Sequence, residues 1–236
     1  MSVSVVILAY QEEENLRILL PKIIRNVEKV DRDYEIIVVD TAKPLDHTED
    51  VCREYGAKYV NQRYPQFGGA FRTAIEEASK DYFLILDGDG SHDPDMIPQI
   101  YQKFVSENRD LVIGSRYVKG GKTNDSKCSI LMSRILNTVF RITLGIDAKD
   151  ISTDYRLYHT QMLKRVPLQC KNYDILEEVL LKMQLQKGTK LDIGEVPIEF
   201  NKRVFGESKR KLVAFIISYL KTLFYLLKVR ITKKMD

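Results

Sequence analysis

The stretch that most constrains this chain is Tyr82–Leu86, a short apolar run followed at once by Asp87-Gly88-Asp89-Gly90. The run is too short for a buried helix and is rich in residues that pack on a sheet, so it predicts a buried strand. Asp87 and Asp89 then stand at the carboxyl end of that strand. One residue separates them on an extended chain, so the two carboxylates point the same way, and the glycines let the backbone turn.

Paired carboxylates of this kind suit a hard divalent cation. Mg²⁺ or Mn²⁺ is usually held by one or two carboxylates plus the oxygens of a substrate diphosphate, because Mg²⁺ loses water reluctantly. Aspartate and glycine also form ordinary polar turns, which is the alternative interpretation. In open α/β sheets, however, ligands bind beyond the carboxyl ends of the strands. The stretch therefore predicts a metal site at Asp87 and Asp89 that takes a nucleotide diphosphate.

Two earlier apolar runs, Val3–Ala9 and Tyr34–Asp40, predict further buried strands, each followed by a helical pattern. Strand and helix alternate in this way through residue 90. Such alternation is typical of parallel strands joined by right-handed crossovers. The strand ends bring Tyr10, Asp40 and Asp87 to one rim, which is the predicted nucleotide site.

The later elements follow in a less regular order. We expect a helix from Pro94 to about Glu107 with Asp93 as its N-cap, a strand at Asp110–Gly114, a mobile loop at Lys119–Ser126, helices at Ile130–Leu144 and Tyr173–Gln186, and a strand at Leu191–Phe200. Pro197 interrupts the last strand, which places that strand at a sheet edge.

Composition excludes several classes of protein. With 236 residues, 44% hydrophobic and 30% charged, the chain is a soluble globular protein of one large domain or two small ones. A net charge of +4 does not indicate a nucleic-acid partner. Cys52, Cys128 and Cys170 are too widely spaced for a disulfide framework or a zinc site, which favours a reducing compartment. The chain has no basic segment before its first strand, so we expect no secretory signal and a cytoplasmic location.

The stretch Leu212–Ile231 is the most apolar in the chain, with basic residues on both sides. Its polar residues recur at helical spacing and form a narrow stripe: Ser218, Lys221, Thr222, Tyr225 and Lys228. Lys221 near the middle makes a single membrane span cost roughly 2.5–3.5 kcal/mol. We therefore expect residues 1–211 to form the catalytic domain and residues 212–236 an amphipathic helix with a basic tail, peripheral at the cytoplasmic face of an anionic membrane. A core-packing helix or a dimer interface is the alternative.

Several motifs together carry a resemblance to a known family. They are Val5-Val6-Ile7-Leu8-Ala9-Tyr10-Gln11-Glu12-Glu13-Glu14-Asn15-Leu16, Asp87-Gly88-Asp89-Gly90-Ser91-His92-Asp93-Pro94, Gly114-Ser115-Arg116-Tyr117, Met132-Ser133-Arg134, Tyr155-Arg156-Leu157-Tyr158, Gly194-Glu195-Val196-Pro197-Ile198 and Arg203-Val204-Phe205-Gly206-Glu207-Ser208-Lys209. These motifs span nearly the whole chain, in order. Through them the sequence resembles the GT-A-fold family 2 glycosyltransferases. Within them it is most similar to the dolichyl-phosphate mannose synthase, or polyprenyl-phosphate glycosyltransferase, branch.

The resemblance implies a fold, a cofactor and a set of site residues. The fold would be a GT-A, Rossmann-like α/β sheet, mostly parallel and flanked by helices. Asp87 and Asp89 would be the DxD pair that binds Mg²⁺ or Mn²⁺ and the donor diphosphate. The donor nucleotide pocket would be lined by Ala9, Tyr10, Glu12 and Asp40, while Arg116, Ser133 and Arg203 would lie near the acceptor phosphate and donor diphosphate.

Two departures from the family pattern matter. Relatives usually carry a second acid after the position of Asp40, where it helps to hold the base, but this chain has Thr41. The choice between a GDP-sugar, a UDP-sugar and other donors is therefore open. Relatives also carry a basic residue at the position of Ser129, and here Lys127 is the nearby candidate.

The implied reaction is attack of a lipid phosphate oxygen on the anomeric carbon of a nucleotide sugar, with inversion. The cation at Asp87 and Asp89 would neutralise the leaving diphosphate. A phosphate acceptor is already anionic, so it needs basic groups to hold it and no strong base. The candidates are Arg116, Lys127, Arg134 and Arg203, and we take Asp89, Arg116 and Arg203 as the catalytic set.

Two other functions compete with this one. A transferase of the same fold that glycosylates a sugar hydroxyl in polysaccharide assembly would need a carboxylate base, for which Asp154 is a weak candidate. A catalytically silent, membrane-associated binding module is the other, and the altered residue at Thr41 favours it. His92 lies near the acids, but it is expected to brace the loop because Mg²⁺ and Mn²⁺ prefer oxygen. The partners expected for the lead function are the nucleotide sugar, a polyprenyl phosphate and the membrane surface, with an integral-membrane protein as a further candidate.

Overall fold

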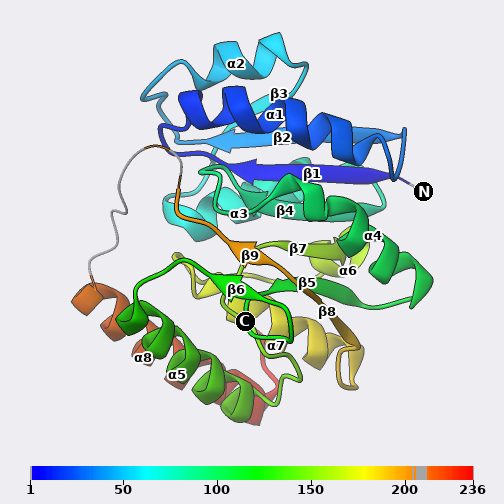
Figure 1. Cartoon of the computed structure of the whole chain (residues 1–236). Coiled ribbons are helices and arrows are strands. Elements are labelled where there is room, and N and C mark those ends of the chain that lie inside the picture. The colour runs from blue at the N-terminus through cyan, green and yellow to red at the C-terminus, as the bar shows by residue number, and fades with distance from the viewer. Residues whose placement is uncertain (1, 204, 206–211, 236) are drawn as a thin grey trace.

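The central element of the computed structural model is a seven-stranded sheet in the order β3-β2-β1-β4-β7-β5-β8 (Figure 1). The structure describes residues 2–203, 205 and 212–235. The strands of the sheet are β1 (Val3–Leu8), β2 (Tyr34–Asp40), β3 (Lys58–Asn61), β4 (Tyr82–Asp87), β5 (Leu111–Ser115), β7 (Arg156–His159) and β8 (Ile193–Pro197). A separate parallel pair is formed by β6 (Lys122–Thr123) and β9 (Glu199–Phe200).

Helices cover both faces of this sheet. They are α1 (Glu13–Val27), α2 (Thr48–Glu54), α3 (Gln66–Glu77), α4 (Ile97–Ser106), α5 (Lys127–Leu144), α6 (Thr160–Lys164), α7 (Ile175–Lys187) and α8 (Leu212–Thr232), with a 3₁₀ turn, η1 (Pro94–Met96), before α4. Asp93 caps this turn, because its side chain accepts a hydrogen bond of 3.0 Å from the backbone N–H of Asp95. The predicted N-cap is thus confirmed.

The sheet is mostly parallel, as the alternation of strands and helices predicts. β1 pairs in parallel with β2 and β4, β2 with β3, and β5 with β8. The exception is β7, which lies between β4 and β5 and runs antiparallel to both. Sequence periodicity does not predict β7, because the strand has only four residues and begins with Arg156.

The strand predicted at Leu191–Phe200 is two strands. β8 lies at the edge of the central sheet, which is where Pro197 can be tolerated. After Pro197 the chain leaves the sheet, and β9 pairs with β6. The segment Lys119–Ser126, predicted as a loop, therefore contains a short strand, and this pairing brings Phe200 toward the carboxyl end of β4.

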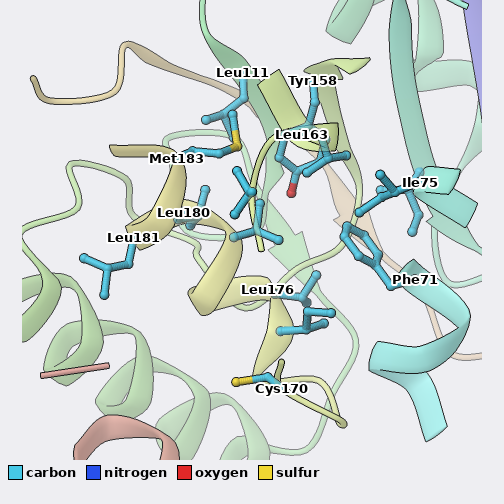
Figure 2. Close-up of a cluster of buried hydrophobic side chains, with 14 of the residues drawn as sticks. Phe71, Ile75, Leu111, Tyr158, Leu163, Cys170, Leu176, Leu180, Leu181 and Met183 are labelled. Atoms are coloured by element: carbon cyan, nitrogen blue, oxygen red, sulfur yellow. The ribbon is translucent and has the colours of Figure 1, made fainter. Parts of the chain in front are cut away.

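Alternate residues of each central strand enter two different cores. On β1, Val6 packs into the cluster beneath α3, α5, α7 and α8, whereas Val5 and Ile7 pack on the other face with α1 and α4. Figure 2 shows part of the first cluster, to which α3 contributes Phe71 and α7 contributes Leu176. Each fully buried side chain of this size contributes roughly 1.5–3 kcal/mol. The sheet is therefore a buried platform whose strand ends are held in place from both sides.

The C-terminal helix α8 packs on the domain, beside α5 and against α7 (Figure 1). Tyr219, Leu226 and Val229 are buried in the first core cluster. Two residues of the predicted polar stripe also face inward: Thr222 donates a hydrogen bond to Asp174, and Tyr225 donates one of 3.3 Å to Glu178. The packing thus matches one of the alternatives considered for this helix.

The outer side of α8 carries large apolar residues. Leu220, Phe224 and Ile231 are all more than half exposed, at 52%, 71% and 77%. Within the described residues, no helix combines the length and the apolar character needed to cross a membrane. The basic residues Lys209–Lys211, which precede α8, lie outside the described part of the chain.

Glu177, in the first turn of α7, is a buried acid with one unpaired carboxylate oxygen among the described residues. It is 2% exposed, and its Oε2 atom has no hydrogen-bond partner among the described residues. Burial raises the pKa of this carboxyl from 4.5 to about 8. The folded protein therefore keeps a proton on Glu177 over a pH range in which the unfolded chain releases it.

Stability should consequently fall as the pH rises from about 5 to 8, by up to about 1.4 kcal/mol per pH unit from this group. Glu177→Gln should remove that contribution, so the free energy of unfolding of the variant should rise relative to that of the wild type as the pH rises. Urea unfolding at several pH values would measure this, with the exposed Glu76→Gln as control. If the free energy of unfolding changes with pH in the same way for the wild type and Glu177→Gln, Glu177 does not hold the proton.

Candidate active site

The acidic turn after β4 is built by two glycines that no other residue could replace without strain. A Cβ atom on Gly88 would lie 2.9 Å from Cγ2 of Ile7, and Gly90 has a φ of +83°. Asp87 ends β4, and Asp89 follows in the turn. Asp89 accepts hydrogen bonds from the backbone N–H of Ser91 at 2.9 Å and from Arg203 at 2.7 Å. The predicted pair of acids therefore stands at the carboxyl end of a central strand, with the positively charged side chain of Arg203 beside it.

Glu12 belongs to the same electrostatic group. Burial raises the pKa of its carboxyl to about 7. A hydrogen bond from Asn15 and the charge of Arg203 lower this pKa, whereas the charges of Asp89 and Asp87 raise it. Only 7% of Glu12 is exposed. The fold thus brings this predicted donor-site residue, from the loop after β1, to the acids after β4.

His92 braces the acidic turn from beneath. Its ring is fully buried between Tyr155 and Phe200, with ring centroids 4.9 and 5.3 Å away. Nδ1 accepts the backbone N–H of Asp87 at 3.0 Å, and Nε2 lies 3.3 Å from Oγ1 of Thr153. Burial lowers the pKa of the imidazole. Because protein groups engage both ring nitrogens, the neutral ring serves as the brace that the sequence predicts.

Asp154 also lies at this turn. Its carboxyl contacts that of Asp87 and comes 3.8 Å from Nδ1 of His92. Burial, and then the neighbouring charge of Asp87, raise the pKa of Asp154 well above its usual value. The ligand atoms of Asp87, His92 and Asp154 all lie within 4.8 Å of one another.

The groups at this turn fit a hard divalent cation. Both nitrogens of His92 are already engaged, so the atoms that face the turn are carboxylate oxygens, which Mg²⁺ and Mn²⁺ prefer. The guanidinium of Arg203 contacts Asp89, which shows that a positive charge is accommodated there.

A second polar group lies at the end of β5, around Arg116. The guanidinium binds Asp150 through two hydrogen bonds of 2.7 and 2.8 Å, and it also donates to Ser152 at 2.8 Å. Asp150 is fully buried. Burial opposes ionisation, but the hydrogen bonds and charge of Arg116 prevail and hold the pKa of Asp150 below its usual value. Arg116 is therefore a fixed, charge-compensated group.

The remaining predicted acceptor residues lie on α5. Oγ of Ser133 is 3.5 Å from a terminal nitrogen of Arg116. The guanidiniums of Arg134 and Arg116 lie over the ring of Tyr117, 5.3 and 5.1 Å from its centroid. Lys127 begins α5 about two turns before Arg134, on the same face, and it is exposed. The structure thus brings Arg116, Ser133 and Arg134 together, with Lys127 at the near end of the helix.

Phe200 connects the two groups. Its ring lies 5.4 Å from the guanidinium carbon of Arg116 on one side and 5.3 Å from the ring of His92 on the other. Phe200 therefore lies between two polar groups: the acids Asp87 and Asp89, which we call the acidic corner, and Arg116 with Ser133, which we call the basic corner. Such an arrangement can hold a cation with a diphosphate at one side and an anionic acceptor at the other.

The predicted base pocket lies at the ends of β1 and β2. Ala9 is buried, and Tyr10 is half exposed. Asp40 is only 1% exposed, and its two oxygens accept hydrogen bonds from the backbone N–H of Thr41 at 2.7 Å and from Tyr59 at 2.9 Å. Both oxygens of Asp40 are thus engaged by the protein, and contact with a donor base stays a prediction.

Sequence reasoning missed four residues of this site: Tyr117, Asp150, Ser152 and Phe200. The polar run before β7 was a usable signal, since it interrupts an otherwise apolar region at the predicted rim. Its pairing with Arg116 was not predictable, because 34 residues separate Arg116 from Asp150. Of the motif that begins at Arg203, the structure describes Arg203 and Phe205, and the rest lies outside the described residues.

Comparison with known proteins gives matches along the whole chain. The protein-family model described as Glycosyl transferase family 2 matches residues 4–167. A dolichol-phosphate mannosyltransferase of Pyrococcus furiosus is 34% identical over 97% of this chain, which spans 64% of the length of that relative. An undecaprenyl-phosphate mannosyltransferase of Micrococcus luteus is 32% identical over 89% of this chain and 87% of its own length.

Among solved structures, glucosyl-3-phosphoglycerate synthase from Mycobacterium tuberculosis shares the fold. Its complex with Mn²⁺, UDP and glucosyl-3-phosphoglycerate gives a TM-score of 0.71 at 21% identity, covering 97% of this chain and 79% of that one. The complex with Mg²⁺ and UDP gives a TM-score of 0.70 at 20% identity, with 97% and 79% covered. At this identity the likeness establishes the architecture of the sheet and its helices.

Proposed function

This chain belongs to glycosyl transferase family 2, and from that premise we propose that it transfers a sugar from a nucleotide-sugar donor to a polyprenyl phosphate, with inversion. The observation that carries the proposal is the pairing of two corners about Phe200: Asp87 and Asp89 on one side, Arg116 with Ser133 on the other. The names of the relatives support a polyprenyl phosphate as acceptor and mannose as the first sugar to test.

The donor would be held at the acidic corner. Asp87 and Asp89 would bind Mg²⁺ or Mn²⁺, which when bound offsets the negative charge that develops on the leaving diphosphate. Arg203 places a second positive charge at the same point, 2.7 Å from Asp89. Glu12, buried next to these acids, would contribute to the donor side of the pocket.

The acceptor would be held at the basic corner. Asp150 fixes the guanidinium of Arg116, so the acceptor phosphate would meet a hydrogen-bond donor whose orientation is already set. Arg134 and Lys127 add positive charge along α5. The phosphate oxygen is anionic and attacks without a general base, which leaves the arginines to orient it.

The geometry disfavours a sugar hydroxyl as acceptor. That reaction requires an ionised carboxylate to remove a proton. Asp154 is the carboxyl considered for this role, but it is only 6% exposed, and its carboxyl is in contact with that of Asp87 rather than free to reach an acceptor. A lipid phosphate acceptor therefore fits the site better.

The direct test uses purified protein, Mn²⁺ and a panel of nucleotide sugars, including GDP-mannose and UDP-glucose. Each donor is combined either with a polyprenyl phosphate or with a soluble sugar. We expect a lipid-linked product from at least one donor. Glycosylation of the soluble sugar alone would favour the rival transferase, and absence of both turnover and donor binding would favour a silent module.

We also propose that the protein binds the cytoplasmic face of an anionic membrane through α5 and α8. These helices lie side by side, and both leave large apolar residues exposed, among them Leu131, Ile135 and Ile142 on α5. Exposed lysines and arginines accompany them, including Lys127, Arg134 and Lys228. Apolar side chains with basic neighbours are typical of surfaces that bind anionic bilayers.

The double variant Ile142→Glu/Phe224→Glu should reduce binding to anionic liposomes by more than about tenfold, because each apolar side chain buried in lipid is worth roughly 1.5–3 kcal/mol. Sedimentation with liposomes measures this. Leu45→Glu, at a residue that is 47% exposed on a distant loop, is the matched control. If the double variant sediments like the wild type, α5 and α8 do not form the membrane surface.

A further inference from the structure

The antiparallel strand β7 has a consequence for the acidic corner. In its register with β4, Arg156 lies opposite Ile85. Continuing that register by two residues places Asp154 opposite Asp87, at the very end of the strand pair. A parallel strand at this position would carry its preceding loop to the opposite end of the sheet. The direction of β7 is therefore what delivers a third carboxyl to the turn.

The surroundings of Asp154 are suited to a cation. The residue is 6% exposed, and its carboxyl contacts the carboxyl of Asp87. His92 lies beside both, but its nitrogens already serve the backbone of Asp87 and the hydroxyl of Thr153. The ligand atoms of Asp87, His92 and Asp154 lie within 4.8 Å of one another, which is close enough for the two carboxylates to bind one cation.

We propose that Asp154 is a third carboxylate ligand of the divalent cation, together with Asp87 and Asp89. The inference rests on the proposed function, because it concerns the same metal site. It adds a specific property: two carboxylates alone leave most of the coordination to substrate oxygens, whereas a third lets the protein retain the cation by itself. This chain should thus bind Mn²⁺ before any nucleotide arrives.

The alternative role for Asp154 is structural, with a protonated carboxyl donating a hydrogen bond to Asp87. Asparagine distinguishes the two roles. It has nearly the same shape and can donate the same hydrogen bond through its amide, but it carries no charge and is a weaker ligand. Asp154→Asn should therefore keep the fold and lose metal affinity, whereas a structural role would leave both unchanged.

The experiment is an equilibrium titration of the full chain with Mn²⁺ alone, in which electron paramagnetic resonance measures the free ion. The titration is repeated with UDP and with GDP. We expect the wild type to bind one Mn²⁺ without nucleotide and Asp154→Asn to bind it at least about tenfold more weakly. Asp95→Asn, at an exposed acid on η1, should bind like the wild type and controls for net charge.

The outcomes separate the inference from the function on which it rests. If Asp154→Asn binds Mn²⁺ as tightly as the wild type, or more tightly, Asp154 is not a ligand and the two-carboxylate site stands. If the wild type binds no Mn²⁺ even with a nucleotide, both the inference and the proposed metal-dependent transfer are overturned. Should Asp154→Asn fail to fold by circular dichroism, Asp154→Gly replaces it under the same criteria.

Discussion

Asp89→Asn should lower kcat/KM by about 10³-fold or more, because it weakens both the hold on the cation and the neutralisation of the leaving diphosphate. The fold should be unaffected. The remaining Oδ1 of asparagine can still accept the backbone N–H of Ser91, which is the contact that shapes the turn. The variant instead removes the charge that faces Arg203.

Initial rates with the best donor and acceptor of the panel would measure this effect, with thermal unfolding to verify the fold. Asp33→Asn is a matched control, since Asp33 is an exposed acid whose partner is Lys80, away from the site. Its rates should equal those of the wild type. Retention of more than a tenth of the wild-type activity in Asp89→Asn would count against the metal assignment.

Lys182→Met should lower the free energy of unfolding by about 3–5 kcal/mol, the usual cost of leaving a buried charge without its partner. Lys182 and Glu178 form a fully buried ion pair on α7, with 2.9 Å between Nζ and Oε1. The ammonium also donates to the carbonyls of Pro167 at 2.7 Å and Met235 at 3.0 Å. Methionine keeps the volume of the side chain but removes the charge and all three contacts.

The same pair anchors the C-terminal helix, so the variant should have a second effect. Tyr225 of α8 donates to Glu178, and Met235 follows α8. We therefore expect faster proteolysis at the C-terminus in Lys182→Met. Lys187→Met is the control, because Lys187 is partly exposed on the same helix and pairs with Asp110 at the surface, which is worth at most about 1 kcal/mol. Equal stability of the two variants in urea would show that the buried pair contributes little.

The role of Asp89 follows from a local pattern, since a short apolar run that ends in Asp-Gly-Asp-Gly specifies a strand, a turn and two carboxylates within ten residues. The importance of Lys182 does not follow from any pattern. A lysine on a helix is normally exposed, and only the packing of α7 beneath α8 buries this one.

The same contrast holds for the polar stripe of α8. Its helical spacing was evident in the sequence and predicted an amphipathic helix. Which side faces the protein was not evident, because Thr222 and Tyr225 find buried partners at Asp174 and Glu178 on a different segment. The stripe therefore packs partly inward, and Phe224 is left outside.

The sequence by itself determined the strands and helices of the first half, the N-cap at Asp93, the edge position of Pro197 and the acids at the end of β4. These features depend on side-chain periodicity and on backbone preferences, which neighbouring residues encode. Only the tertiary structure decided that β7 runs antiparallel, that Asp150 orients Arg116 and that Asp154 meets Asp87. Such contacts join segments far apart in the chain, and they depend on the order and direction of strands in the sheet, which no local pattern specifies.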